Sequence, residues 1–87
     1  MIDIVIYSKD NCTYCEQAKN LLKINDLEFR ELKLNEDFSR DEILELFPTA
    51  RTFPIIVINN TYIGGYSQLT TEMEHGIDNL GKTVILG

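Results

Sequence analysis

The sequence has few cysteines, one histidine and few basic residues, and each shortage excludes a class of protein. Two cysteines in 87 residues are too few for a secreted scaffold held together by disulfides, so a reducing, cytoplasmic location is expected. One histidine and two cysteines cannot complete a structural zinc site unless carboxylates join them, and we expect no bound metal. Fourteen acidic against eight basic residues give a net charge of −6, which argues against nucleic acid as a partner.

Long hydrophobic runs and an amino-terminal signal peptide are also lacking. No apolar stretch approaches the roughly 20 residues that a membrane-spanning helix needs, so we expect no membrane contact. A chain of 87 residues is long enough for one hydrophobic core and too short for a second domain. The sequence therefore predicts a single domain over residues 1–87, and we expect it to be a monomer.

Strand and helix patterns alternate along the chain. Strands are predicted over 2–7, 27–32, 55–58 and 61–63, and helices over about 12–24, 39–47 and 64–80, before an apolar tail at 84–86. Ser39 and Glu42 form a capping-box pattern, and Asn59-Asn60 predicts a tight hairpin. The β-α-β-α-β-β-α order predicts an α/β fold. A parallel βαβ unit and an antiparallel hairpin would form a mixed four-stranded sheet with helices on both faces.

The two cysteines, Cys12 and Cys15, lie where the first strand gives way to the first helix. A thiol at the first turn of a helix faces free N–H groups and the positive end of the helix dipole, so we expect a depressed pKa for Cys12. Cys15 lies one turn further in and should stay protonated longer, which makes Cys12 the attacking sulfur and Cys15 the resolving one. Half of a zinc site and a permanent disulfide are the alternatives. A disulfide across a two-residue gap would stabilise the fold only weakly, so a redox function is favoured.

Three stretches carry a family resemblance. Lys9 with Cys12-Thr13-Tyr14-Cys15 resembles a lysine followed by C-P-Y-C, Arg51–Pro54 resembles R-T-V-P with a cis proline, and Gly64–Gln68 resembles G-G-x-[SD]-D. These are the motifs of the glutaredoxins, and on them the chain is identified as a member of that family, with a thioredoxin-like fold. A thioredoxin would be expected to have a tryptophan before C-G-P-C, and the chain has no tryptophan.

The resemblance implies that the chain is a glutathione-disulfide oxidoreductase with glutathione as co-substrate. The implied glutathione contacts are Lys9, Tyr14, Arg40, Thr52, Phe53, Pro54, Tyr66 and Ser67. Lys9 would meet the glycyl carboxylate, although from sequence alone it is equally consistent with a solvated surface lysine. The backbone of Phe53 would pair with the cysteinyl residue, and Tyr66 and Ser67 would hold the γ-glutamyl end. Gln68 replaces the usual aspartate.

The family resemblance implies protein disulfides and glutathionylated proteins as substrates. Ribonucleotide reductase is a standard acceptor for such enzymes, but nothing in the sequence selects it. Two alternatives remain open. Thr13 stands where the family usually has proline, so Cys12 could instead share an iron–sulfur cluster between two chains. The chain could also be a small thioredoxin-like donor reset by a flavin reductase.

Overall fold

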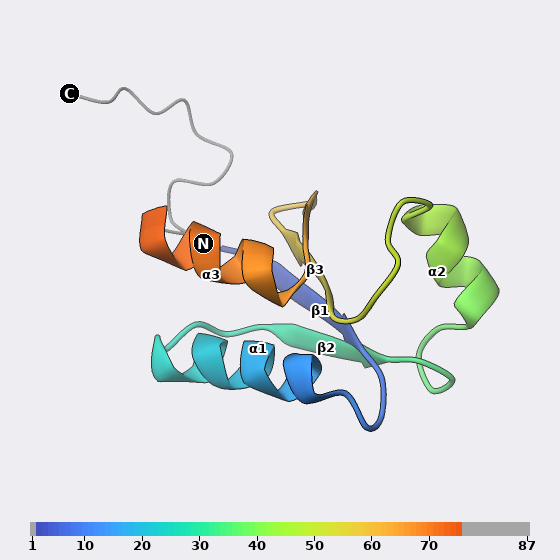
Figure 1. Ribbon diagram of the computed structural model, residues 1–87, viewed down its shortest axis with the longest axis horizontal. Coiled ribbons are helices and arrows are strands. Elements are labelled where there is room, and N and C mark those ends of the chain that lie inside the picture. Colours follow the sequence, from blue (N-terminus) through green and yellow to red (C-terminus); the bar gives the residue numbers. More distant parts are fainter. Residues whose placement is uncertain (1, 76–87) are drawn as a thin grey trace.

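The computed structural model describes residues 2–75, which form one sheet and three helices (Figure 1). The elements are β1 (Ile4–Ser8), α1 (Thr13–Ile24), β2 (Arg30–Lys33), α2 (Arg40–Leu46), β3 (Ile55–Ile58), β4 (Thr61–Gly64) and α3 (Tyr66–His75). Their order confirms the predicted sequence of strands and helices. Over these residues no helix combines the length and apolarity needed to cross a membrane.

The sheet is mixed and has the strand order β2-β1-β3-β4. β1 pairs in parallel with β2 and antiparallel with β3, and β3 pairs antiparallel with β4. Because side chains alternate along a strand, Ile4 and Ile6 face α1 and α3, where they pack with Leu22 and Leu69 in the larger core. On the opposite face, Ile55 packs with residues of α2 and of the segment before it. Helices therefore cover both faces, as predicted.

Helix α1 starts at the turn that follows β1 and carries the cysteine pair. Cys12 is its N-cap, and Ala18 and Leu22 are buried against the sheet about two and three turns later. The helix ends in a Schellman motif: Asp26 has a φ of 57°, and the N–H of Leu27 donates to the carbonyl of Leu22.

The second strand is shorter at its start than the sequence predicted. The N–H of Leu27 is used by the cap of α1, and the first pair between β1 and β2 joins Val5 to Arg30. The alternation of 27–32 still has a structural meaning, because Leu27 and Phe29 pack against the larger core from outside the strand. The prediction of a strand from residue 27 was wrong because hydrogen bonding at the helix end takes precedence over the side-chain pattern.

The capping box on α2 is confirmed. The Ser39 hydroxyl accepts the N–H of Glu42 at 3.2 Å, and the Glu42 carboxylate accepts the N–H of Ser39 at 2.8 Å. Ile43 is the buried residue of the helix, and it packs with Phe38 and Ile55 in the smaller core. α2 is thereby held beside the loop that leads into β3.

The β3–β4 hairpin and the start of α3 form the other side of the site. Asn59 and Asn60 have φ angles of 50° and 66°, the left-handed pair that a two-residue hairpin turn requires, so the predicted hairpin is confirmed. α3 begins at Tyr66, two residues after the predicted start, because Gly64 still belongs to β4. The predicted helical residue Ile77, the helix end near Gly81 and the apolar tail lie outside the described residues.

Candidate active site

The cysteine pair lies at the amino-terminal end of α1. Cys12 and Cys15 form a disulfide with a Cα–Cα distance of 5.2 Å. The backbone N–H of Cys15 donates to Sγ of Cys12 at 3.1 Å, so one of the free donors of the first turn points at the Cys12 sulfur. Cys12 is half-buried, whereas Cys15 is fully buried. The two sulfurs therefore differ in access to solvent and in hydrogen bonding, while the predicted difference in pKa stays a prediction.

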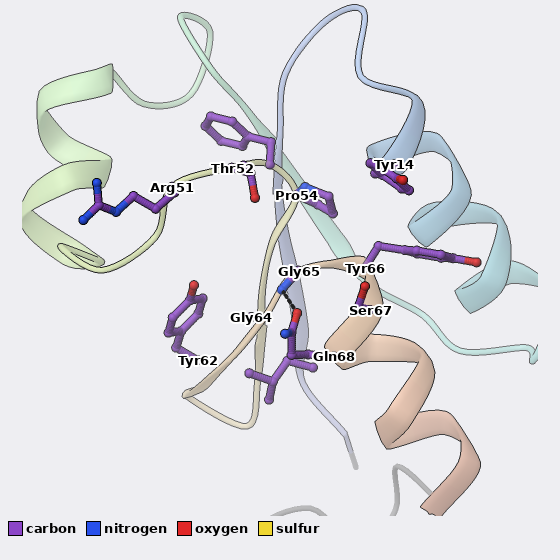
Figure 2. A pocket seen from close by; sticks show the side chains of 12 residues that line it. Tyr14, Arg51, Thr52, Pro54, Tyr62, Gly64, Gly65, Tyr66, Ser67 and Gln68 are labelled. Carbon is purple, nitrogen blue, oxygen red and sulfur yellow. Dashed lines mark hydrogen bonds between the residues drawn. The ribbon is translucent and has the colours of Figure 1, made fainter.

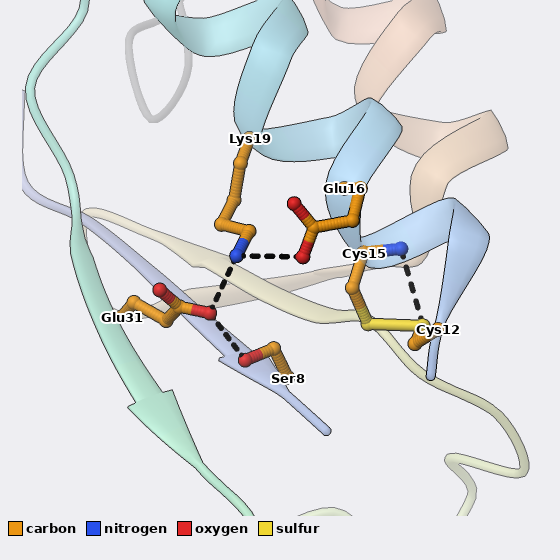
Figure 3. Close-up of a disulfide and its surroundings, with 6 residues drawn as sticks. All are labelled: Ser8, Cys12, Cys15, Glu16, Lys19 and Glu31. Atoms are coloured by element: carbon orange, nitrogen blue, oxygen red, sulfur yellow. Dashed lines mark hydrogen bonds and ion pairs between the residues drawn. A yellow bond between two sulfur atoms is a disulfide. The ribbon is translucent and has the colours of Figure 1, made fainter. Parts of the chain in front are cut away.

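A cluster of polar side chains lies beside the disulfide (Figure 3). The Glu31 carboxylate of β2 accepts a hydrogen bond of 2.6 Å from the hydroxyl of Ser8, which is buried, and one of 2.9 Å from the Lys19 ammonium. Lys19 is one turn after Cys15 on α1, and it also contacts Glu16 at 2.9 Å. Burial raises the pKa of Glu31, but the hydrogen bonds from Ser8 and Lys19 and the positive charge of Lys19 outweigh it, so that pKa is lower than usual.

The Glu31 cluster should make stability depend on pH. Because the folded state lowers the pKa of Glu31 from 4.5, its stabilising contribution is present above about pH 4.5 and is lost as the pH falls through the folded value. We expect Glu31→Gln to lower the free energy of unfolding at pH 7 by about 1–2 kcal/mol. The difference from the parent should shrink toward pH 3. Chemical denaturation of the oxidised protein at both pH values measures this.

Glu28→Gln provides a matched control, because Glu28 is exposed and precedes the same strand. It should leave the free energy of unfolding nearly unchanged at either pH. If the two variants had the same pH dependence, the Glu31 carboxylate would not be the group responsible.

The loop before β3 approaches the cysteine pair from the side of α2. The peptide bond between Phe53 and Pro54 is cis, as the family resemblance implied. Pro54 is buried and Phe53 is half-buried, with its ring stacked on Phe38 at a centroid distance of 6.1 Å. The Lys9 ammonium lies 5.9 Å from the centroid of the Phe53 ring, close enough for a cation–π contact. Lys9 is exposed, and its ammonium lies over the same loop.

One pocket lies between this loop and the start of α3, with a volume of about 570 Å³ (Figure 2). Its lining residues are Tyr14, Arg51, Thr52, Phe53, Pro54, Tyr62, Ile63, Gly64, Gly65, Tyr66, Ser67 and Gln68. The rings of Tyr14 and Tyr66 stack at 5.9 Å and close one side. A Cβ on Gly65 would lie 3.3 Å from the carbonyl oxygen of Pro54, so the absence of a side chain lets α3 start close to the loop. We call this the α3 pocket.

A second pocket of about 530 Å³ lies on the other side of Phe53, toward α2, and is called the α2 pocket. Its lining residues are Lys9, Asn11, Cys12, Thr13, Tyr14, Arg40, Ile43, Leu44, Phe47, Ala50, Arg51, Thr52, Phe53 and Ile55. Tyr14, Arg51, Thr52 and Phe53 line both pockets, so the two form one groove that passes Cys12. No aspartate or glutamate lines either pocket among the described residues, although the chain has fourteen acids.

The groove brings together nine of the ten residues that the sequence singled out. Lys9, Cys12 and Arg40 line the α2 pocket, Pro54, Tyr66 and Ser67 line the α3 pocket, and Tyr14, Thr52 and Phe53 line both. Cys15 lines neither pocket because it is buried beneath Cys12. Their individual roles stay predictions.

Some lining residues were not among the implied glutathione contacts. Arg51 belongs to a recognised motif and from sequence could either meet glutathione or only order its loop; the fold places it in both pockets. Ile43, Leu44, Phe47 and Ala50 form the apolar wall of the α2 pocket, and the first three belong to the apolar face of the predicted helix over 39–47. Its helical spacing was the available signal, and that spacing does not distinguish a pocket wall from a core.

Comparison with known proteins identifies the family of this chain. The glutaredoxin family model matches residues 4–63, which contain both cysteines and the cis proline. The chain belongs to the glutaredoxin family. It is 32% identical to glutaredoxin 3 of Escherichia coli strain K12 over 83 residues, which cover 94% of this chain and all of that protein.

Two solved glutaredoxins agree with this assignment. The solution structure from Brucella melitensis is 35% identical, covers all of this chain and 96% of that one, and superposes with a TM-score of 0.72. A buckwheat glutaredoxin in complex with glutathione is 25% identical, with a TM-score of 0.72 over 84% of this chain and 69% of that one.

Membership of the family establishes the class of reaction. This glutaredoxin is a glutathione-dependent thiol–disulfide oxidoreductase of thioredoxin-like fold, with a dithiol pair at Cys12 and Cys15. Within residues 2–75, no group of three or more histidine, cysteine or acidic side chains is arranged to hold a metal ion.

Proposed function

We propose that this glutaredoxin reduces glutathione mixed disulfides and protein disulfides, with Cys12 as the nucleophile and Cys15 as the resolving cysteine. Cys12 is the half-buried member of the pair, and its sulfur receives a backbone hydrogen bond at the amino-terminal end of a helix. Both features favour the thiolate, which is the reactive form. Cys15 is buried, so a bulky disulfide substrate meets Cys12 first.

Glutathione would lie along the groove with its sulfur at Cys12. Its glycyl carboxylate would lie in the α2 pocket near Lys9 and Arg40, and its cysteinyl backbone beside Phe53. Its γ-glutamyl carboxylate would reach the α3 pocket, where the first N–H groups of α3, at Tyr66 and Ser67, have no partner within the helix.

The charge of the groove is the observation that carries this proposal. Lys9, Arg40 and Arg51 line it together with no acid among the described residues, although the protein has a net charge of −6. An anionic tripeptide would therefore be attracted to this groove and repelled from most of the remaining surface. A protein disulfide needs no such concentration of positive charge.

The reaction would proceed by two exchanges. The Cys12 thiolate attacks the glutathionyl sulfur, a Cys12–glutathione disulfide forms, and the substrate thiolate leaves and takes a proton from water. A second glutathione thiolate then attacks the bound glutathionyl sulfur, so that oxidised glutathione leaves and the Cys12 thiolate is restored. With a protein disulfide, the Cys12 thiolate first displaces one protein thiolate and forms a mixed disulfide with the other sulfur. Cys15 then attacks the Cys12 sulfur, releases the second protein thiolate and leaves the Cys12–Cys15 disulfide.

The test is turnover of the mixed disulfide of glutathione and 2-mercaptoethanol with two electron sources. We expect NADPH oxidation with glutathione and glutathione reductase, and little with thioredoxin reductase alone. Turnover only with thioredoxin reductase would leave the chemistry of Cys12 and Cys15 intact but would contradict a glutathione site.

A charge control makes the assay specific for the groove. Lys9→Gln should raise the KM for glutathione several-fold, because about 1 kcal/mol of a partly exposed charge pair is lost. Lys23→Gln removes the same charge from the exposed last turn of α1, outside both pockets, and should leave KM unchanged. Equal effects would mean that only the net charge matters.

A further inference from the structure

The α3 pocket has donors for a carboxylate but lacks the anion that would select an ammonium group. Among its twelve described lining residues, Arg51 is the one with a charged side chain. The free N–H groups at the start of α3 and the positive end of its dipole add further positive potential. A group that enters this pocket therefore meets positive charge and neutral acceptors only.

Gln68 is the residue that leaves the α3 pocket without a negative charge. Its Oε1 accepts a hydrogen bond from the backbone N–H of Gly65 at 2.9 Å, which holds the amide at the amino-terminal end of α3 (Figure 2). The side chain lies over Gly64, where a Cβ would be only 2.7 Å from Cγ of Gln68 and where φ is 121°. Nε2 can only donate, and Oε1 keeps one further lone pair, so this side chain offers an ammonium group a neutral acceptor but no negative charge.

We propose that Gln68 removes selection for an ammonium group at the far end of the co-substrate, so that the α3 pocket accepts thiols whose far end carries a carboxylate alone. This proposal rests on the glutathione site proposed above and defines its substrate class. The α-ammonium of the γ-glutamyl residue would gain no charged partner here. A glutathione analogue without that ammonium keeps every favourable contact of the carboxylate.

The probe is glutaryl-cysteinylglycine, which is glutathione with the α-ammonium replaced by hydrogen. Each thiol is supplied as a mixed disulfide with 5-thio-2-nitrobenzoate. The Cys12 thiolate attacks the sulfur of the peptide thiol, the new disulfide forms at Cys12, and the coloured thiolate leaves without a proton. The rate at which this thiolate appears with the reduced protein gives a second-order rate constant for each peptide, and the ratio of the two constants reports the selection.

For the unmodified chain, we expect the two rate constants to agree within about threefold. Gln68→Glu is nearly isosteric and keeps an acceptor for the Gly65 N–H while it adds a negative charge. It should shift the ratio about tenfold toward glutathione, as expected for one charge-assisted hydrogen bond. Gln68→Asp tests the same shift with a shorter carboxylate.

The matched control is Gln17→Glu, the same chemical change on the exposed surface of α1, outside both pockets. It should leave the ratio unchanged. A tenfold preference of the unmodified chain for glutathione, or a ratio that neither Gln68 variant alters, would overturn the proposal while the glutathione site stands. If neither peptide reacted faster than the mixed disulfide of 2-mercaptoethanol, the glutathione site and this proposal would both be wrong.

Discussion

Cys12→Ser is expected to abolish turnover of both glutathione mixed disulfides and protein disulfides, by about a thousandfold or more. The thiolate of Cys12 is the proposed nucleophile, and a serine hydroxyl is not ionised at neutral pH, so no mixed disulfide can form. The measurement is NADPH oxidation coupled to glutathione reductase, together with mass spectrometry of the protein after incubation with oxidised glutathione.

The variant should fold, so that the loss is chemical. Cys12 is the N-cap of α1, and its sulfur accepts the N–H of Cys15. Serine is among the preferred N-cap residues, because its hydroxyl accepts the same kind of hydrogen bond. The thermal unfolding midpoint should therefore remain close to that of the reduced parent. Retention of turnover by a folded Cys12→Ser protein would assign the nucleophile elsewhere.

Cys15→Ser is expected to separate the two activities. Deglutathionylation needs only Cys12 and a second glutathione, so turnover of the glutathione mixed disulfide should remain within about threefold of the parent. Reduction of a protein disulfide without glutathione should fall by about a hundredfold, because nothing resolves the mixed disulfide with Cys12. Reduction of insulin by the pre-reduced protein, with and without glutathione, measures the second activity.

Cys15→Ala is the matched control, because Cys15 is fully buried and a serine hydroxyl there could lack a hydrogen-bond partner. The hydrogen bond to the Cys12 sulfur comes from the backbone of residue 15, so both variants keep it. The two should therefore show the same separation of activities. Equal loss of both activities in both variants would contradict the division of roles between Cys12 and Cys15.

The sequence by itself determined the order of strands and helices, the hairpin and the position of the cysteine pair. Each of these depends on neighbours within a few residues. Examples are the capping box of Ser39 and Glu42, the positive φ angles of Asn59 and Asn60, and the place of Cys12 at the end of a strand and the start of a helix. Local hydrogen bonding and side-chain periodicity can be predicted from residues that are close together in the sequence, which is why these predictions were confirmed.

Only the tertiary structure decided the polar contacts beside the cysteines and how the loop before β3 meets the start of α3. Sheet pairing of β1 with β2 brings Glu31 to Ser8 and Lys19. The close approach of Gly65 to Pro54 joins the start of α3 to the cis-proline loop, and so places Arg51 and Gln68 in one pocket. These contacts join residues far apart in the chain, and their geometry depends on how sheet and helices pack. A pattern of neighbouring residues therefore contains no signal for them.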